Sequence, residues 1–587
     1  MATERDPLLV NGSSLERSKH HHPGPLEISR STRYGILAGL WSANFLSALN
    51  TTLVATLLPS ISSEFNKSNE ASWLGTSYLL AACTFTPLYG RLCNVMGRRG
   101  ANQLAVSIAA LGTLCCGLST NMEMLIVARF LSGMGGGGIN TTSTITTSDM
   151  YTIRSRGLTQ GVASLFNGLG MGLGGPIGGF ISDRFGWRWA FLIQMPLFVF
   201  SLVLTSYNLR YVTPGKGKSP KEVLMRIDYG GSFSLLISVG SCLVFLSMKY
   251  NEDRSWSDPW VFVSLALAGS FFVIFILVEL LVAPEPILAP HLLKQKVPVL
   301  VGISNFLVSL CNFSVMYFFP MWFQTVALTS ASMAGLHLLP NSTSMSIGSL
   351  FAGWMMHRTG KYKLINLIFG VFPFIGITLI TLMREDSGPL QMWLSIIPLG
   401  FGNAVVLQTM LKSWMAVGTG FGQVFRGLGQ VGGVAISSAL FQSKLDYELR
   451  SRIHGDNAAE IVSKIRHSAT LVGKLSPELQ RIARDSYAVS LRAVFTLAAC
   501  STFLAYIARL PIPDKNLGEK KADQRPKSSD RRPSALPSAT EHAVDSGSDD
   551  ENTRPLLSQR GRGRKFSTLE SEDAIHDLES GGSARQQ

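Results

Sequence analysis

The strongest constraint on this chain is the scarcity of charge between residues 34 and 510. These 477 residues contain 54 Lys, Arg, Asp and Glu, about 11%, against about 25% in an ordinary soluble domain. Repeated apolar runs of about 20 residues cross the stretch, which is the length of a helix that spans a bilayer. The pattern predicts a membrane protein with many spans. It excludes a soluble enzyme, a secreted protein and a nucleic-acid-binding protein.

The two ends of the chain have a different composition. Residues 511–587 hold 27 charged residues together with many Ser and Pro, and residues 1–33 are polar. We expect both segments to be disordered, as a cytosolic arm and a cytosolic tail. The arm lacks the apolar core of a signal peptide.

The seven cysteines fall in or beside apolar runs without a C-x-x-C pair, so we expect them to be small packing residues.

We expect fourteen transmembrane helices, because at these lengths only helices satisfy their own backbone polar groups inside lipid. The apolar runs lie near 34–58, 71–92, 100–119, 122–146, 157–181, 187–209, 228–248, 259–282, 297–319, 333–356, 363–383, 389–411, 414–441 and 488–510.

The loop charges predict an orientation. With the N-terminus in the cytosol, the cytosolic loops carry sixteen Lys or Arg and the short opposite loops carry six. The positive-inside rule then places both termini in the cytosol. One segment disagrees, because residues 442–487 hold eight Lys or Arg and must face the other side. Six acidic residues in the same segment partly neutralise them.

Three short motifs recur in the same order about 260 residues apart, which indicates an internal repeat. The pairs are Asn44-Phe45-Leu46 with Asn305-Phe306-Leu307, Gly90 and Gly97-Arg98 with Gly353 and Gly360-Lys361, and Phe166 to Gly170 with Phe425 to Gly429. They predict two six-helix halves, 34–210 and 297–510, joined by a linker at 211–296 that adds two helices. Transporters built from paired halves bind substrate between the halves, near the midplane.

Several motifs resemble those of the major facilitator superfamily. The loop from Gly90 to Arg99 resembles its signature loop between helices 2 and 3, and Arg129 resembles its helix-4 arginine motif. Fourteen helices, with Trp187-Arg188-Trp189 entering helix 6, resemble the drug:proton antiporter branch. Within that branch, the runs 53–59 and 422–434 are most similar to fungal vacuolar basic amino acid transporters. The resemblance implies the major facilitator fold.

The resemblance also implies a gate at the cytosolic mouth, in which arginines pair with an acid in one conformation only. Two residues depart from the family pattern, because Asn94 and Asn50 stand where the family usually has acids. The arginines could instead serve only to anchor the topology. The expected gate residues are Gly90, Gly97, Arg98, Arg99 and Asp149.

A glycine-rich run on helix 5 resembles the antiporter motif of the family. Small residues allow close, sliding contact between helices in lipid, so the run is expected to be a hinge. Plain close packing is the alternative. The motif residues are Gly174, Gly175, Pro176, Gly178 and Gly179.

Polar and charged residues inside the helices predict a substrate or proton pathway. Arg129 and Arg426 suit an anionic group such as the carboxylate of an amino acid, although each could form an internal pair instead. Asp149 is the preferred proton site, unless it serves only in the gate. The expected pathway residues are Asn50, Arg129, Asn167, Gln194, Asn312 and Arg426.

The N-terminal arm carries a match to an acidic dileucine sorting signal, formed by Glu4, Leu8 and Leu9. Signals of this kind are read by vacuolar or lysosomal adaptors. A chance match to so loose a pattern is the alternative.

Taken with the resemblance, these features predict a proton-coupled antiporter that moves amino acids, basic ones above all, into the fungal vacuole. The alternatives are a plasma-membrane drug or siderophore:proton antiporter and an amino-acid sensor without transport. We expect no enzyme, because there is no nucleophile–base pair, metal-ligand spacing or phosphate loop. The expected partners are a small-molecule substrate, protons, the lipid bilayer and a sorting adaptor. We expect a monomer with no cofactor, no metal and no nucleic acid.

Overall fold

The computed structural model describes residues 28–151, 153–211, 225, 228–282, 288, 290–359, 363–414, 419–454 and 457–512. Contacts divide the chain into two units, Met1–Asp523 and Gln524–Gln587. The second unit, most of the expected disordered tail (513–587) and most of the expected arm (1–27, with Glu4, Leu8 and Leu9) lie outside the described residues. Residues 30–33 of the expected arm belong to the first helix, which begins at Arg30.

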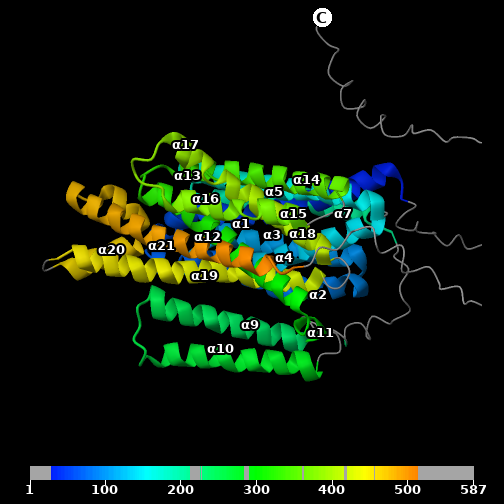
Figure 1. Ribbon diagram of the computed structural model, residues 1–587, viewed down its shortest axis with the longest axis horizontal. Helices are drawn as coiled ribbons and strands as arrows, with labels where there is room; N and C mark the ends of the chain where they lie inside the picture. Colours follow the sequence, from blue (N-terminus) through cyan, green and yellow to red (C-terminus); the bar gives the residue numbers. More distant parts are fainter. Residues whose placement is uncertain are drawn as a thin grey trace, which may run out of the picture. The chain divides into compact units, whose positions relative to one another are not determined.

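The first half is a bundle of antiparallel helices (Figure 1). We call the face at which its first helix begins the near face, and the face at which that helix ends the far face. Its elements are α1 (Arg30–Glu64), η1 (Ser68–Glu70), α2 (Ser72–Val95), α3 (Gly97–Leu118), α4 (Met122–Met150), α5 (Ile153–Phe185), α6 (Trp187–Leu192) and α7 (Met195–Asn208).

Two further spans follow and pack beside the bundle. The first of them contacts α2 and α19, and the second contacts mainly the first, as Figure 1 shows. Trp260, Phe262 and Phe272 are exposed on α10, as expected for side chains that face lipid. The elements are α9 (Tyr229–Leu246) with the π-helix η2 (Ser247–Asn251), α10 (Pro259–Leu277) with the π-helix η3 (Val278–Val282), and α11 (Pro290–Leu293).

The second half repeats the architecture of the first. Its elements are α12 (Lys296–Thr325), α13 (Ala331–Leu336), α14 (Leu339–Thr359), α15 (Lys363–Phe369), α16 (Phe372–Thr381), α17 (Pro389–Leu394), α18 (Ile397–Trp414), α19 (Thr419–Arg452), α20 (Ala458–His467), η4 (Ala469–Lys474) and α21 (Pro477–Arg509).

Four spans consist of two helical segments each, and proline explains every break. Each second segment, α7, α14, α16 and α18, carries proline at its second position. Proline lacks an N–H and fits the first turn of a helix, where no intrahelical partner is needed. The four prolines are Pro196, Pro340, Pro373 and Pro398.

All fourteen apolar runs fall on these helices, and the described residues contain no strand. The predicted fold class is therefore confirmed. Ten of the described spans are long and apolar enough by themselves to cross a membrane. The others are α2, α4, α5 and the pair α13–α14, whose Gly, Ser, Thr and Asn content lowers their hydropathy. Most of these helices meet the opposite half, where lipid does not reach them.

The packing repeats between the halves. Helix α1 packs against α5 and α7, as α12 packs against α19 and α21, and α2 packs against α4 as α14 packs against α18. Between the halves, α5 contacts α13 and α14, while α19 contacts α2. The same exchange relates α1, α2 and α5, in which the first copies of the three repeated motifs begin, to α12, α14 and α19, in which the second copies begin.

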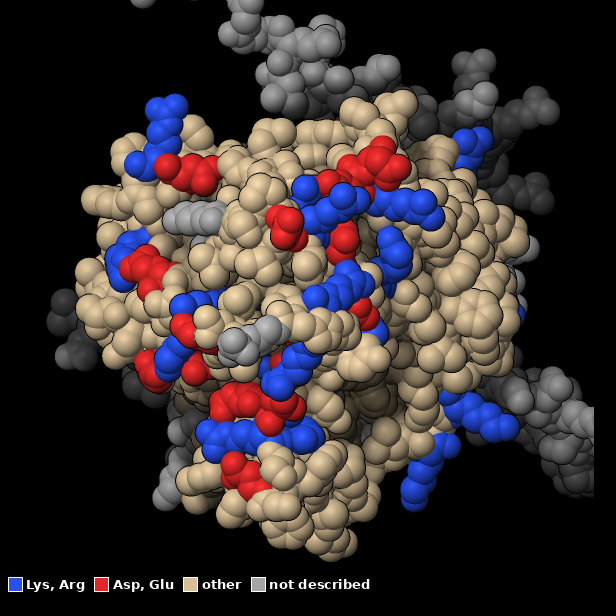
Figure 2. Space-filling model, turned by 90° about the vertical axis from the view of Figure 1, so that its left-hand side faces the viewer, with Lys and Arg blue, Asp and Glu red and all other residues tan. Residues whose placement is uncertain are grey.

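The basic segment 442–487 is folded and ion-paired instead of being an open loop. Helix α19 continues to Arg452, and Arg450 and Arg466 lie 2.7 and 2.8 Å from the carboxylate oxygens of Asp446. Lys444 and Arg452 both contact Glu448. Figure 2 shows the far face, with basic and acidic side chains next to one another. This pairing offsets the charges that conflict with the positive-inside count.

Candidate functional site

Helix α5 carries glycines that face the second half. A β-carbon on Gly179 would lie 2.6 Å from the carbonyl carbon of Ala331, and one on Gly175 would lie 3.0 Å from the carbonyl oxygen of Gly335. Real β-carbons hardly ever approach within 3.0 Å of another atom. Glycine therefore permits backbone-to-backbone packing of the two halves.

The other two glycines of the motif face the first half. A β-carbon on Gly178 would lie 3.0 Å from Leu53 of α1, and one on Gly174 would overlap Thr52. Helix α5 is continuous through Pro176. The motif thus packs on two sides at once, and its role as a hinge stays a prediction.

The halves separate toward the near face. Gly161 precedes Gly179 by eighteen residues, which is five helical turns, so the two point the same way. A β-carbon on Gly161 would meet nothing within 4 Å, and the same holds for Gly353 on α14. The structure is therefore closed at the far face and parted at the near face.

Hydrogen bonds between the halves reinforce the closure at the far face. They join side chains of one half to backbone groups of the other, so they need no matching side chain in the partner. They are Tyr317 Oη to the Thr51 carbonyl at 3.3 Å, Gln324 Nε2 to the Thr56 carbonyl at 3.1 Å, Gln442 Nε2 to the Ser68 carbonyl at 3.4 Å and the Ser332 amide to Asp183 Oδ2 at 3.1 Å.

Arg426 faces the space between the halves. Its predecessor Phe425 packs on Gly302 of α12, and its successor Gly427 packs on Cys83 of α2. Successive residues on a helix are about 100° apart, so Arg426 points between α12 and α2. Its side chain is half-buried, and among the described residues it has no hydrogen-bond or ion-pair partner. A guanidinium in this position is available to an anionic group.

Amide and hydroxyl groups accompany Arg426 on the near side. Asn167 of α5 and Asn305 of α12 are half-buried, while Asn140 and Thr144 of α4 are exposed. The side chain of Asn140 also donates to Ser47 Oγ at 3.4 Å. Polar side chains exposed to lipid at this depth would be costly, so we infer that they face the space between the halves, which we call the chamber.

Arg129 lies inside the first half, away from this chamber. It is fully buried, and its guanidinium donates to the backbone carbonyls of Leu74 at 3.0 Å and Asn50 at 3.2 Å. It also lies over the ring of Tyr78, 4.4 Å from the centroid. The geometry makes Arg129 a clamp between α4, α1 and α2.

Three more of the predicted pathway residues are also buried within a half. The side chain of Asn50 donates to Gln194 Oε1 at 2.8 Å, which ties α1 to the break between α6 and α7. Asn312 accepts from Asn403 at 3.5 Å. Of the six predicted pathway residues, the structure therefore brings only Asn167 and Arg426 to the space between the halves.

The helices of both halves are free of carboxylates along most of their length. The sequence has no Asp or Glu in 34–63, 124–148, 153–182, 296–384 or 387–445. A cationic group in the chamber must therefore be held by amide, hydroxyl and carbonyl oxygens.

The predicted gate residues meet at the near face, within the first half. Arg98 Nε lies 2.7 Å from Asp149 Oδ2, and its Nη1 donates to the carbonyl of Cys93 and the Asn94 side chain, both at 3.0 Å. Asn94 thus supplies a neutral acceptor where the family has an acid. Tyr211 donates to Asp149 at 3.4 Å, and burial together with that carboxylate raises the pKa of Tyr211.

The two gate glycines differ. Gly97 has φ 74°, a left-handed conformation that favours glycine, at the turn between α2 and α3. Gly90 lies inside α2, where a β-carbon would meet only Thr141, at 4.0 Å. The signature loop is expected to begin at Gly90, but α2 continues to Val95, so Gly90 is helical. Arg99 is exposed.

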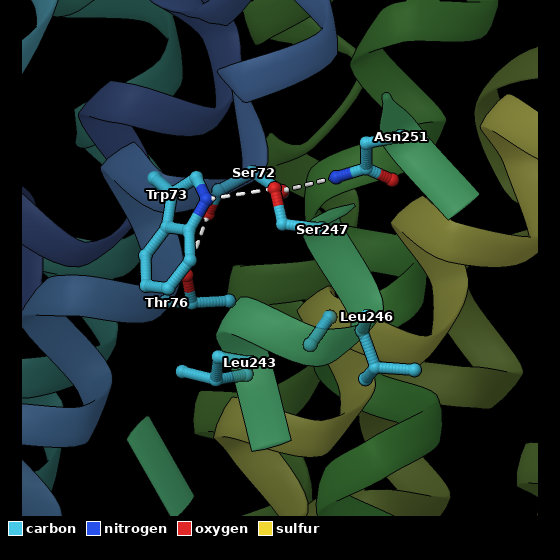
Figure 3. A pocket seen from close by; sticks show the side chains of 8 residues that line it. Ser72, Trp73, Thr76, Leu243, Leu246, Ser247 and Asn251 are labelled. Carbon is cyan, nitrogen blue, oxygen red and sulfur yellow. Dashed lines mark hydrogen bonds between the residues drawn. The ribbon is translucent and has the colours of Figure 1, made fainter. Parts of the chain in front are cut away.

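A small pocket lies near the far face, where an inserted span meets both halves. In Figure 3, Trp73 of α2 donates to Ser247 Oγ at 3.0 Å, and Asn251 donates to Ser72 Oγ at 3.4 Å. The lining contains no charged side chain, so the pocket does not suit an ionic substrate. It is formed by Ser72, Trp73, Thr76, Leu243, Leu246, Ser247, Asn251 and Ala435.

The fold, with its two packed halves, agrees with a comparison of the sequence with known families. The model of the Major Facilitator Superfamily matches residues 40–438. The chain belongs to the major facilitator superfamily. It is a multi-pass membrane transporter of that superfamily.

Curated fungal members of the superfamily are similar over most of the chain. Multidrug resistance protein fnx1 of Schizosaccharomyces pombe is 34% identical over 87% of this chain and 97% of its own. The vacuolar membrane amino acid uptake transporter fnx2 of the same yeast is 30% identical over 82% and 84%. Vacuolar basic amino acid transporter 2 of Saccharomyces cerevisiae is 30% identical over 77% and 99%.

Solved structures of superfamily members share the fold. A bacterial homologue of the human lysosomal transporter Spinster superposes with a TM-score of 0.53 at 15% identity, covering 82% of this chain and 98% of its own. A bacterial homologue of the human peptide transporters PepT1 and PepT2 gives a TM-score of 0.54 at 13% identity with the same coverage.

Sequence reasoning missed the groups that join the halves of this superfamily member at the far face. Tyr317, Gln324 and Gln442 donate to backbone carbonyls, and any residue supplies a carbonyl. No residue type in the partner segment marks such a contact. Only the spacing of the glycines on α5 pointed to this face.

Replacing Asp149 by asparagine should lower the thermal stability of the purified protein. The substitution removes a charge-assisted contact between two largely buried groups, worth about 1–2 kcal/mol. Arg99→Gln is the matched control, because Arg99 is an exposed neighbour of the pair. Equal melting temperatures of the two variants would show that the Arg98–Asp149 contact contributes nothing to the stability of the fold.

Proposed function

We propose that this transporter is a proton-coupled antiporter that carries basic amino acids from the cytosol into the fungal vacuole. The observation that carries the proposal is Arg426, an unpaired guanidinium among the described residues that faces the space between the halves. The near face is the cytosolic one in this proposal, in line with the loop charges.

The chemistry of the chamber suits a zwitterion with an additional cation. Arg426 pairs with the α-carboxylate, since guanidinium and carboxylate match in geometry. The amide oxygens of Asn167 and Asn305 accept from the cationic side chain, in place of a carboxylate. A buried cation needs several such oxygens. The absence of acids along these helices supports weak, reversible binding of the cation.

Alternating access follows from the two ends of the chamber. In this proposal the described state admits substrate from the near face, and the close contacts at the glycines of α5 keep the far face closed. Separation of Gly175 from Gly335 opens the far face and releases the substrate there. In this proposal Asp149 carries the proton that returns from the acidic lumen, and release of this proton to the cytosol re-forms the Arg98–Asp149 ion pair of the described state and so favours that state.

Two further features support the proposed location in the vacuolar membrane. The chain is similar to vacuolar amino acid transporters over more than three quarters of its length. The arm carries the acidic dileucine pattern of Glu4, Leu8 and Leu9, which in this proposal is read by a sorting adaptor.

Uptake into vacuolar vesicles tests the proposal. Vesicles from a fungal strain that contains the protein should show ATP-dependent uptake of labelled Lys, Arg and His, and a protonophore should abolish it. Vesicles from the same strain without the protein are the control. Equal uptake in the two preparations would contradict the assignment to basic amino acids.

The second candidate is drug:proton antiport at the plasma membrane. The 34% identity to a multidrug resistance protein favours it. In that case a fluorescent fusion should label the cell rim, and deletion should sensitise cells to drugs without a change in vacuolar Lys and Arg content.

A further inference from the structure

A niche at the near face of the second half contains buried donors without acceptors. It lies where α15 begins, α18 approaches its end and α21 ends. Arg509, the last residue of α21, is 2% exposed. The lining residues are Lys363, Asn366, Leu367, Met410, Arg509 and Ile512.

Only part of the Arg509 guanidinium is used by the fold. Its Nη2 donates to the carbonyl of Gly370 at 3.1 Å, at the break between α15 and α16. Its Nε and Nη1 are buried and have no partner. A buried donor without an acceptor is unfavourable, and more so on a charged group, so a ligand that accepts from both nitrogens is favoured.

The niche is positive without a compensating acid among the segments that build it. Lys363 is the second cation of the lining, and it has no ion pair among the described residues. The described residues within 296–384, 387–445 and 486–513 include no Asp or Glu, and the next acid in the sequence, Asp514, lies outside the described residues. Two cations that converge without a carboxylate are a site for an anion.

A third group in the niche points to a ligand that also carries a hydroxyl. The side-chain nitrogen of Asn366 donates to Thr409 Oγ1 at 2.6 Å, while its Oδ1 is buried without a partner. An anionic oxygen cannot satisfy Oδ1, whereas a hydroxyl next to the anion can donate to it.

The depth of the niche matches the headgroup layer. Lys363 opens one candidate span, and Arg509 closes another, both at the near face. Basic side chains at this level of a membrane attract anionic headgroups. We propose that the niche binds a phosphate group with a neighbouring hydroxyl, as in the headgroup of an inositol phospholipid, through Lys363, Asn366 and Arg509. The site is separate from the chamber that contains Arg426.

The test uses the full-length protein in nanodiscs. One arm adds phosphatidylinositol 4-phosphate to a phosphatidylcholine bilayer, and the other adds inorganic phosphate to pure phosphatidylcholine discs. The readouts are the melting temperature and the lipid retained in native mass spectra. A higher melting temperature with the lipid alone assigns the site to a headgroup. A higher melting temperature with inorganic phosphate alone assigns it to free phosphate. No rise in either arm overturns the proposal.

Lys363→Gln is the decisive variant, because Arg509 also supports the Gly370 carbonyl and its loss disturbs the fold. Lys363→Gln should weaken binding about tenfold, the effect of one charge-assisted contact. Arg509→Lys, which keeps the charge but loses the two-nitrogen fork, should weaken it as well. The control is Arg358→Gln, which changes an exposed arginine in the last turn of α14 that does not line the niche. Equal weakening by Arg358→Gln and Lys363→Gln would indicate surface attraction only and overturn the site.

Discussion

Replacing Gly335 by alanine should open the far face of the transporter while the protein remains folded. The added β-carbon would lie 2.8 Å from the Pro176 nitrogen and still closer to the carbonyl group of Gly175. Neither backbone can yield without parting the halves. Overpacking of this kind costs about 1–3 kcal/mol, which shifts the two-state population by about 5- to 150-fold. Net flux should fall, because each cycle must pass through the closed state.

The measurement is labelling of a cysteine placed at Thr56, in a background with Cys242 and Cys500 changed to serine. Thr56 is fully buried, and its carbonyl accepts from Gln324 across the seam. A membrane-impermeant maleimide should label this cysteine about tenfold faster in Gly335→Ala. The control is Gly353→Ala, where a β-carbon meets nothing within 4 Å. Equal labelling in the two variants would falsify the claim that the contact between Gly175 and Gly335 closes the far face.

The number of spans could be predicted from the sequence, but their ends could not. Apolar length alone marks the part of a helix inside the hydrocarbon core. Helix α21 begins at Pro477 and α19 ends at Arg452, both more than ten residues beyond the predicted spans. These extensions are polar and ion-paired, so tertiary contacts, and not lipid, stabilise them.

The breaks within the spans could not be predicted either, although the prolines were visible. Pro59, Pro87 and Pro320 lie inside continuous helices, while Pro340 and Pro373 restart broken ones. In lipid, neighbouring helices can satisfy the groups that proline leaves unpaired. Whether a helix breaks therefore depends on neighbours that are distant in the sequence.

The candidate site shows the same limit. Arg129 and Arg426 are both arginines within apolar helices, and the sequence gives them the same expected role. The structure separates them through their neighbours. Carbonyls of α1 and α2 accept hydrogen bonds from Arg129, whereas Arg426 has no hydrogen-bond or ion-pair partner among the described residues. The helix face of a residue can be read from the sequence, but the partner of that face cannot.

Replacing Arg426 by glutamine should abolish saturable uptake of basic amino acids without loss of stability. Among the described residues the guanidinium has no hydrogen-bond or ion-pair partner to lose, so the free energy of unfolding should stay within about 0.5 kcal/mol of wild type. A lost charge-assisted pair with the substrate carboxylate costs about 1.5–3 kcal/mol, so apparent affinity should fall about 10- to 150-fold. Uptake at rising substrate concentration and thermal unfolding measure the two effects separately.

Arg129→Gln is the matched comparison, because it changes the same residue type in the other half. Arg129 is fully buried and holds two backbone carbonyls, so its loss should lower the melting temperature together with flux. Amino acid amides, which lack the α-carboxylate, should inhibit uptake of labelled amino acids by the wild-type protein only weakly. They should inhibit uptake by Arg426→Gln no less than they inhibit uptake by the wild type. If amides and amino acids inhibit wild-type uptake equally well, Arg426 does not bind the carboxylate. The chamber would then recognise its substrate through the cationic side chain alone.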